Sequence, residues 1–170
     1  MQMILSVNMG PEEYAAKHEE IEFPKIDVCP MCKARKRLHS HGSFQRNALP
    51  EKNKVLLVRI HRFFCTVCKK TVSLVPSFLV PHFQYTAHFL VGSILGKVET
   101  YRELLRFHQK RFLKNLNLIQ AFFREMGFRW SLPEAGKERA IKLAEEIENL
   151  GVGSFSLLYH KQHHRSFMAV

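Results

Sequence analysis

Hydrophobic and polar residues alternate over positions 58–64, within a run of β-branched and aromatic residues at positions 55–64. Alternation of this kind predicts a β-strand with one side facing solvent. Residues 37–46 can form its antiparallel partner, and the segment 47–53 carries turn-forming residues between the two. The sequence therefore predicts a β-hairpin in the first half of the chain.

A helical spacing takes over in the second half. Residues 84–95 are apolar and end before Gly96, a residue type that commonly follows the end of a helix. Thr100 and Glu103 form a capping box, which predicts a long helix opening at Tyr101. Apolar positions then recur at spacings of three and four, which predicts one buried face. This face runs towards Gly127 and consists of Leu105, His108, Phe112, Leu116, Ile119, Phe123 and Met126.

A third helix is predicted after Ser131. Ser131 and Glu134 form a second capping box, with Pro133 in the first turn. The apolar stripe of this helix ends at Gly151 and consists of Ile141, Ala144, Ile147 and Leu150. The last segment, 153–170, shows no clear period, so we expect an irregular tail. Its histidines, to which we assign no site, are His160, His163 and His164.

Composition and charge narrow the functional classes. A chain of 170 residues has room for one domain or two small ones, and 46% hydrophobic with 24% charged residues is ordinary for a folded protein. The net charge of +11 is uneven: residues 29–72 hold 11 basic and one acidic residue, whereas residues 1–28 hold two and six. A basic compact module is typical of a polyanion partner, because phosphate contacts release condensed counterions. The alternative is a basic surface that serves solubility.

The first ten residues lack the basic stretch of a signal peptide, and no apolar run approaches the roughly 20 residues that span a bilayer. We therefore expect a cytoplasmic protein without a membrane partner. In a reducing compartment, paired cysteines hold metal more often than they form disulfides.

Four cysteines give the strongest chemical signal. Cys29 and Cys32 form one CxxC pair and Cys65 and Cys68 another, with 32 residues between the pairs. Each pair puts two thiolates on one tight turn, and two such turns provide the tetrahedral sulfur shell that zinc prefers. A shell of four sulfurs leaves no position for water, so we expect one structural Zn²⁺. A hairpin between two such turns is the layout of a zinc ribbon.

Two other interpretations of the cysteines stay open. The first pair could be a redox motif, because Lys33, Arg35 and Lys36 would lower a thiol pKa. A redox motif needs no second CxxC, however, and it normally opens a helix after a strand. The second interpretation replaces one cysteine ligand by a histidine, for which the candidates are His39, His41 and His61.

The sequence around the cysteines resembles the zinc-ribbon segment of bacterial insertion-sequence transposases and of small transposase-related proteins of uncharacterised family. The similar motifs cover about residues 28–82 and are Cys29-Pro-x-Cys32, Leu38, 41–46, 62–71 and 74–79 leading to Pro81. The resemblance implies recognition of DNA by a mobile-element protein. In such proteins a helix-turn-helix and then a catalytic RNase H-like domain usually follow the ribbon.

The carboxylates depart from that family pattern. Transposases of this kind hold two metal ions with carboxylates, whereas Asp27 is the single aspartate of this sequence and precedes the ribbon. The C-terminal glutamates are expected to form the solvated face of a helix; they are Glu134, Glu138, Glu145, Glu146 and Glu148. We therefore expect a DNA-binding relative that is not an enzyme and has no small-molecule substrate.

Basic residues in two places are candidates for nucleic-acid contacts. Those of the ribbon are Arg35, Lys36, Arg37, Arg46, Arg59, Arg62, Lys69 and Lys70, interleaved with Phe44, Phe63 and Phe64, which we expect in the ribbon core. Arg102, Arg106 and Lys110 lie on one face of the long helix, which with the helix ending at Leu95 could form a helix-turn-helix. The alternative for the helix is an ordinary solvated face.

The sequence as a whole predicts an α+β fold, with an N-terminal zinc ribbon followed by a small all-α region of about three helices. The predicted segments are an acidic lead 1–27, the zinc ribbon 28–75, a linker 76–83 bracketed by prolines, a helical region 84–152 and the tail 153–170. The lead is expected to be loosely ordered or to form one short helix ending before Pro24. Pro76 and Pro81 exclude a regular helix across the linker.

Three functions follow in order of preference. The first is a zinc-ribbon DNA-binding protein, the second a ribbon that binds RNA or an acidic protein, and the third a thiol redox enzyme or sensor. A homo-oligomer is also considered, because the apolar residues of the helices exceed what one three-helix unit must hide. These residues are Phe89, Leu90, Phe112, Phe122 and Phe123.

Overall fold

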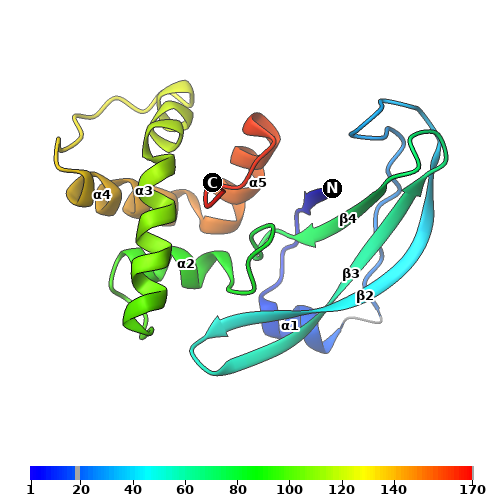
Figure 1. Ribbon diagram of the computed structural model, residues 1–170, viewed down its shortest axis with the longest axis horizontal. Helices are drawn as coiled ribbons and strands as arrows, with labels where there is room; N and C mark the ends of the chain where they lie inside the picture. Colours follow the sequence, from blue (N-terminus) through cyan, green and yellow to red (C-terminus); the bar gives the residue numbers. More distant parts are fainter. Residues whose placement is uncertain (18–19, 170) are drawn as a thin grey trace.

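The computed structural model describes residues 1–17 and 20–169 as an α+β fold, with the sheet on one side of the molecule and most helices on the other (Figure 1). Within these residues no helix is long and apolar enough to cross a membrane. The strands are β1 Gln2–Leu5, β2 Leu38–Glu51, β3 Lys54–Cys65 and β4 Thr71–Pro76. The helices are α1 Pro11–Ala16, α2 Ala87–Ile94, α3 Arg102–Glu125, α4 Gly136–Leu150 and α5 Val152–His163.

The sheet has the strand order β1-β4-β3-β2, and its main feature is the antiparallel hairpin of β2 and β3. This hairpin is longer than the sequence predicts, because only Lys52 and Asn53 separate the two strands. Asn53 has a φ of 64°, a left-handed conformation that asparagine tolerates in a tight turn. A register shift between Ala48 and Glu51 accommodates Pro50, which has no N–H group for the ladder. The predicted turn over 47–53 was therefore too long.

The N-terminal segment contains the short helix α1 that was one of its two expected forms, together with the strand β1, which was not expected. β1 pairs in parallel with β4, and α1 packs on the hairpin (Figure 1). Tyr14 of α1 is fully buried, its ring meets Phe78 edge-on at 5.3 Å, and its hydroxyl donates to the Arg59 carbonyl at 2.9 Å. One aromatic residue therefore fixes an otherwise acidic segment on the sheet. His18 and Glu19 lie outside the described residues.

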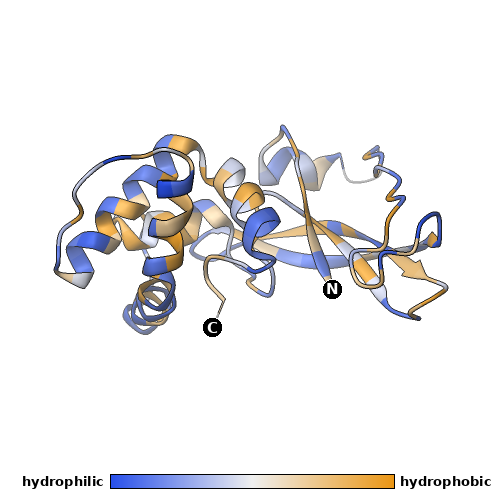
Figure 2. Cartoon of the chain, turned by 90° about the horizontal axis from the view of Figure 1, so that it is seen from above, coloured by the Kyte–Doolittle hydropathy of each residue, from blue (hydrophilic) through white to orange (hydrophobic). Residues whose placement is uncertain are grey.

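The helices α2 to α5 surround an aromatic core, and Figure 2 shows hydrophobic and hydrophilic residues alternating along them. The predicted face of α3 is buried at His108, Phe112, Leu116, Ile119 and Phe123. Its last member, Met126, is exposed because the helix ends at Glu125.

Neither predicted capping box forms. Tyr101, rather than Thr100, is the N-cap of α3, and the Thr100 hydroxyl is buried without a partner among the described residues. The fourth helix begins at Gly136 with Ala135 as its N-cap, so the Ser131 box and Pro133 lie ahead of it. In both cases tertiary packing sets the start of the helix.

The predicted tail contains α5, which raises the number of described helices after residue 84 from the expected three to four. Val152, Phe155, Ser156 and Tyr159 are buried at helical spacing, although polar residues interrupt the hydrophobic stripe. The Phe155 ring stacks on Phe123 at 5.7 Å and meets Phe122 edge-on at 5.2 Å. The fifth helix thus completes the core that α3 and α4 leave open.

The tip of the hairpin contacts the turn between α2 and α3. The Lys52 ammonium forms an ion pair with Glu99 and lies 4.6 Å from the centre of the Tyr101 ring. The Tyr101 hydroxyl donates to Asn53 Oδ1 at 3.1 Å. These contacts connect the sheet to the start of the long helix.

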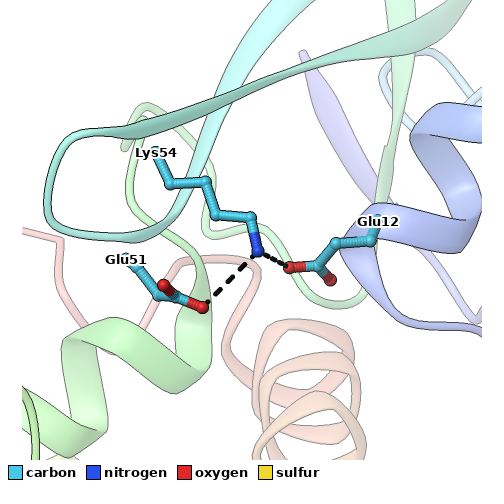
Figure 3. Close-up of polar contacts among 3 residues, drawn as sticks. All are labelled: Glu12, Glu51 and Lys54. Atoms are coloured by element: carbon cyan, nitrogen blue, oxygen red, sulfur yellow. Dashed lines mark hydrogen bonds and ion pairs between the residues drawn. The ribbon is translucent and has the colours of Figure 1, made fainter.

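A second group of charges joins the tip to α1. Lys54 Nζ lies 2.8 Å from Glu12 Oε1 and 3.5 Å from Glu51 Oε1 (Figure 3). All three side chains are largely exposed. The hydrogen bond from Lys54 lowers the pKa of Glu12 from its usual value.

Candidate metal centre and nucleic-acid interface

The hairpin explains how cysteines 32 residues apart in sequence come together. Because β2 and β3 are antiparallel, the start of β2 lies beside the end of β3, with Leu38 opposite Cys65. The first CxxC pair precedes β2, and the second begins at the last residue of β3. A longer hairpin would move only its tip and leave the two cysteine turns in place.

The four sulfur atoms lie in the geometry of a metal shell. The distance from Cys29 Sγ to Cys68 Sγ is 3.8 Å, that from Cys32 Sγ to Cys65 Sγ is 3.7 Å, and all four lie within 4.8 Å of one another. A tetrahedral zinc site with Zn–S bonds of about 2.3 Å has sulfur–sulfur separations of about 3.8 Å. The four cysteines therefore fit a single metal ion. In the described residues no other group of histidines, cysteines and carboxylates has ligand atoms this close.

The two cysteine turns have the same backbone hydrogen bonds. In the first, the Cys29 N–H donates to the Ala34 carbonyl at 2.9 Å and the Lys33 N–H donates to the Cys29 carbonyl at 2.9 Å. In the second, the corresponding donors and acceptors, at 3.0 Å each, are Cys65 N–H to Lys70 O and Lys69 N–H to Cys65 O. Lys33 and Lys69, which follow each pair, have positive φ of 61° and 57°. The left-handed residue turns the chain back after each CxxC.

The electrostatics of the four thiols favour a bound cation. The backbone N–H of Cys68 lowers the pKa of Cys65 to about 6, so this thiol ionises readily. Desolvation, together with the neighbouring sulfurs, raises the pKa of Cys68 to about 11. Sulfurs this close cannot all become thiolates without a positive charge between them, and a divalent metal ion supplies it.

The histidine alternatives lie outside the sulfur cluster. His61 is buried, with Nε2 3.2 Å from Ser40 Oγ and Nδ1 3.1 Å from Ser43 Oγ. Phe23 stacks on its ring at 4.8 Å, and desolvation lowers the pKa of His61. Both ring nitrogens therefore already have partners. His41 packs against Phe64 at 5.5 Å.

Basic residues surround the cysteine turns. Of the candidates named from the sequence, those exposed at this end of the hairpin are Arg35, Lys36, Arg37, Lys69 and Lys70, and Lys33 is exposed as well. None of these side chains forms an ion pair within the described parts of the chain. The surface formed by the five candidates, the turn surface, is thus an uncompensated positive patch.

The other basic residues of the hairpin have different surroundings. Arg46 is half-buried and donates to the carbonyls of Val80 and Phe83, so it anchors the segment after β4 and is a poor candidate for a phosphate contact. Desolvation lowers its pKa. Arg59 is half-buried, with its guanidinium 5.9 Å from the Phe23 ring. The sequence could not show either arrangement, because both sets of contacts are long-range.

Arg62 lies with its guanidinium 5.4 Å from the exposed Phe44 ring. Of the three aromatic residues expected in the hairpin core, Phe63 is buried, Phe64 is half-buried and Phe44 is exposed. The expectation therefore holds fully only for Phe63.

On α3, Arg102, Arg106 and Lys110 are all exposed and lie at spacings of four. The preceding α2 is almost entirely buried, with His88 as its exposed residue. The contacts of Lys52 and Asn53 described above hold the hairpin tip at the start of this helix. Sequence reasoning missed them, because their partners Glu99 and Tyr101 are far away along the chain.

The remaining carboxylates form no second metal cluster within the described residues. Glu138, Glu145 and Glu148 are exposed on α4, as expected. Two glutamates differ from the expectation: Glu146 is buried and pairs with Lys142 at 3.2 Å, and Glu134 lies ahead of the helix. The five phenylalanine and leucine residues considered for association are all buried in the chain itself, so they offer no surface to a second copy; they are Phe89, Leu90, Phe112, Phe122 and Phe123.

Comparison with protein families gives one match. Residues 29–105 match a family described as a domain of unknown function, DUF6431. The match runs from the first cysteine through the hairpin and α2 into the first turn of α3. It therefore includes both sides of the contact between the hairpin tip and the residues before α3. Comparison with curated proteins gave no match, and neither did comparison with solved structures.

Proposed function

We propose that this chain is a DNA-binding protein built on a structural zinc ribbon, related to insertion-sequence transposases but without nuclease chemistry. The observation that carries the proposal is the turn surface, where five exposed basic residues flank the sulfur cluster without an acidic partner among the described residues. Phosphate groups would supply the missing negative charge.

The zinc ribbon is inferred from two features together. The sulfurs have the separations of a tetrahedral S₄ shell, and the cysteine turns lie together at the open end of the hairpin, one before β2 and one after β3. The shell is closed, so the Zn²⁺ would hold the turns and leave no coordination position for substrate. The metal thus orients the basic residues on each turn.

The transposase relationship is supported by the order of motifs around the cysteines, and the absence of nuclease activity by the carboxylates. Asp27 is exposed and stands just ahead of the first cysteine turn. Two-metal nucleases need several carboxylates around one site. We therefore assign the chain a binding role without catalysis. A location in the cytoplasm, with access to DNA, is part of the same proposal.

The exposed face of α3 is the proposed second contact. Arg102, Arg106 and Lys110 occupy the N-terminal half of the helix, where helix-turn-helix proteins contact bases. The hairpin tip fixes the start of this helix through Asn53 and Tyr101. A groove-binding helix needs such support, because register on DNA depends on rigid placement.

Salt dependence of binding tests the proposal. The affinity for duplex DNA should fall linearly on a log–log scale with salt, measured by fluorescence anisotropy in a potassium chloride series. The double variant Lys69→Gln/Lys70→Gln should reduce the slope by about two, because each phosphate that the protein no longer neutralises changes the slope by roughly 0.9. Arg102→Gln/Arg106→Gln tests the helix in the same way.

The matched control is Lys137→Gln/Lys161→Gln, which removes the same charge from exposed positions on α4 and α5. It should leave the slope unchanged. Absence of DNA binding at low salt, or an equal decrease of the slope in the control, would contradict the proposal.

A second candidate is binding of RNA. Phe44 is exposed with the Arg62 guanidinium against its ring, and such a pair suits stacking on an unpaired base. Tighter binding of single-stranded RNA than of duplex DNA, abolished in Phe44→Ala, would favour this alternative.

A further inference from the structure

A cavity of about 410 Å³ lies between the sheet and the helices, and none of its lining residues belongs to the turn surface or to the proposed α3 contact. It is bounded by the N-terminal strand, the segment 81–83, α3 and the residues around the end of α5. Its cationic or titratable side chains are His82, Arg111, His160, His164 and Arg165. No aspartate or glutamate is among the described residues that line it.

The two arginines are held in place by aromatic rings and by neutral oxygens of the described chain, including the Met168 carbonyl 3.5 Å from Arg111 Nη1. The Arg111 guanidinium lies 4.8 Å from the Phe107 ring and 5.5 Å from the Phe83 ring. Arg165 Nη2 donates to the Ala169 carbonyl at 3.2 Å and lies 3.4 Å from Asn115 Oδ1. Neither arginine pairs with a carboxylate in the described residues, so both retain a full charge at the cavity.

Two polar atoms beside the cavity have no partner within the described chain. They are Arg165 Nε and Gln2 Oε1, and both are buried. The His160 ring, by contrast, hydrogen-bonds to the backbone of Gln2 and Arg165. Buried polar groups are normally hydrogen-bonded, so a ligand that engages the two unpaired atoms would complete this site. Because neither atom is open to the cavity, rotation of the Arg165 side chain would bring its donor to an acceptor oxygen, and rotation of the Gln2 amide would offer its NH₂ group.

Two histidines on the cavity wall have backbone conformations that side chains rarely adopt. His82 has a φ of 68° and His164 a φ of 53°. Both are exposed. His164 is the C-cap of α5, where this conformation is common, so only His82 is unusual in this respect. Pro81, Phe83 and Ala169 provide an apolar wall beside the charged groups.

We propose that this cavity binds a phosphate monoester attached to an organic group of about the size of a nucleoside. Guanidinium groups match phosphate oxygens in a bidentate manner, and the cavity falls within the range of about 300–1,000 Å³ typical of small-molecule sites. The apolar wall would hold the organic part. His160 and His164, to which the sequence analysis assigned no site, line this cavity. The proposal also gives the protein a small-molecule ligand, which the sequence did not predict.

The ligand could come from a free mononucleotide or from the 5′-phosphorylated end of a strand. The cavity shares no residue with the proposed DNA contacts, so the two proposals can fail separately. Calorimetric titration of the full chain with deoxyadenosine monophosphate, deoxyadenosine and inorganic phosphate at fixed ionic strength tests the site. We expect saturable binding of the nucleotide that exceeds both partial ligands.

Arg165→Gln should weaken nucleotide binding about tenfold or more, because it removes a charged hydrogen-bonding group. This variant could also loosen the C-terminal residues, so a second variant, His82→Asn/His164→Asn, is needed. Asparagine tolerates a positive φ, and both side chains are exposed, so the fold should persist. Lys161→Gln, on the exposed side of α5, is the matched control and should bind as the unaltered chain does.

Weaker binding in both site variants, with the control unaffected, would support the site. Duplexes with a 5′-phosphate or a 5′-hydroxyl group then distinguish the sources, since a strand end requires a preference for the phosphate that Arg165→Gln removes. Absence of nucleotide binding, equal affinity for deoxyadenosine, or unchanged binding in both site variants would overturn the proposal. Equal affinity for inorganic phosphate would overturn the assignment of an organic group.

Discussion

The cysteine end of the hairpin and the core of the helices are stabilised in different ways. The helical core contains tightly packed aromatic rings, including Phe122, Phe123 and Phe155, all fully or almost fully buried. At the cysteine end, Cys32 and the residues between each cysteine pair are exposed or half-buried, and the nearest cluster packs α1 on the middle of the hairpin. Hydrophobic burial can support the helices, whereas the cysteine end buries little of its own, so we expect a metal ion at the four sulfurs to stabilise it.

Metal removal should have the largest effect of the changes considered, and it should act on the cysteine end alone. Structural zinc contributes about 10–16 kcal/mol in small zinc-binding peptides, which is comparable to the whole stability of a domain. A chelator, or Cys65→Ser, should therefore unfold the cysteine turns and leave the helices folded. Hydrogen exchange should show fast exchange at the Lys33 and Lys69 amides, which are protected by the turn hydrogen bonds.

Trp130 provides the control, because it is the single tryptophan and packs on Phe123 and Phe128 in the helical core. Its fluorescence should not change on chelation. Turn amides that stay protected without metal would contradict the expectation, as would loss of helical structure in the same step.

Truncation of the helical core should give the converse result. Phe155→Ala leaves a cavity against Phe122 and Phe123 and should lower the free energy of unfolding by about 3–5 kcal/mol. Urea unfolding followed by Trp130 fluorescence measures this change. Metal content, measured by mass spectrometry on the folded variant, should remain one ion per chain. If the variant no longer bound metal, the two regions would be one cooperative unit.

The sequence predicted the parts of the fold that depend on local pattern. The alternation at 58–64 predicted β3, and the spacing from Leu105 to Phe123 predicted the buried face of α3. It missed α5 and the docking of α1, because each depends on a few residues that meet distant partners. Tyr14 is one such residue, since it contacts Phe78 and the Arg59 carbonyl.

The candidate site also has one part that local sequence predicts and another that depends on tertiary packing. The four cysteines could be found from their spacing, because each CxxC turn is a local structure. The basic residues could not be sorted by sequence alone. Arg46 is half-buried against the Val80 and Phe83 carbonyls, while Lys69 and Lys70 are exposed. Only the tertiary packing separates an anchoring arginine from a free cation.

Acid should weaken the helical region through His108. Burial lowers the pKa of His108 to about 4, and the Nδ1 atom lies 3.0 Å from Ser93 Oγ. The unfolded chain, with an ordinary histidine pKa near 6.5, binds the proton first, so stability is complete above pH 6.5 and falls between pH 6.5 and 4. The loss should be roughly 3 kcal/mol at about 1.4 kcal/mol for each pH unit.

His108→Leu isolates this contribution, because leucine cannot titrate and Ser93 keeps its hydrogen bond to the Leu90 carbonyl. Urea unfolding by Trp130 fluorescence at pH 7.5 and pH 4.5 should show a smaller decrease for the variant than for the unaltered chain. Acid also protonates cysteine ligands, and the difference between the two proteins cancels that contribution. Equal decreases in the two proteins would show that protonation of His108 does not cause the acid sensitivity.

The smallest effect is expected at the charges that join α1 to the hairpin tip. Lys54→Met removes the contacts to Glu12 and Glu51 seen in Figure 3 and should change the free energy of unfolding by about 0–1 kcal/mol, because these side chains are exposed. A double-mutant cycle with Glu12→Gln, measured by urea unfolding at low and high salt, gives the coupling. The Tyr14 ring, which also belongs to α1, is fully buried. If the cycle gave more than about 2 kcal/mol, beyond the range of exposed ion pairs, α1 would be held on the sheet by charge as well as by aromatic packing.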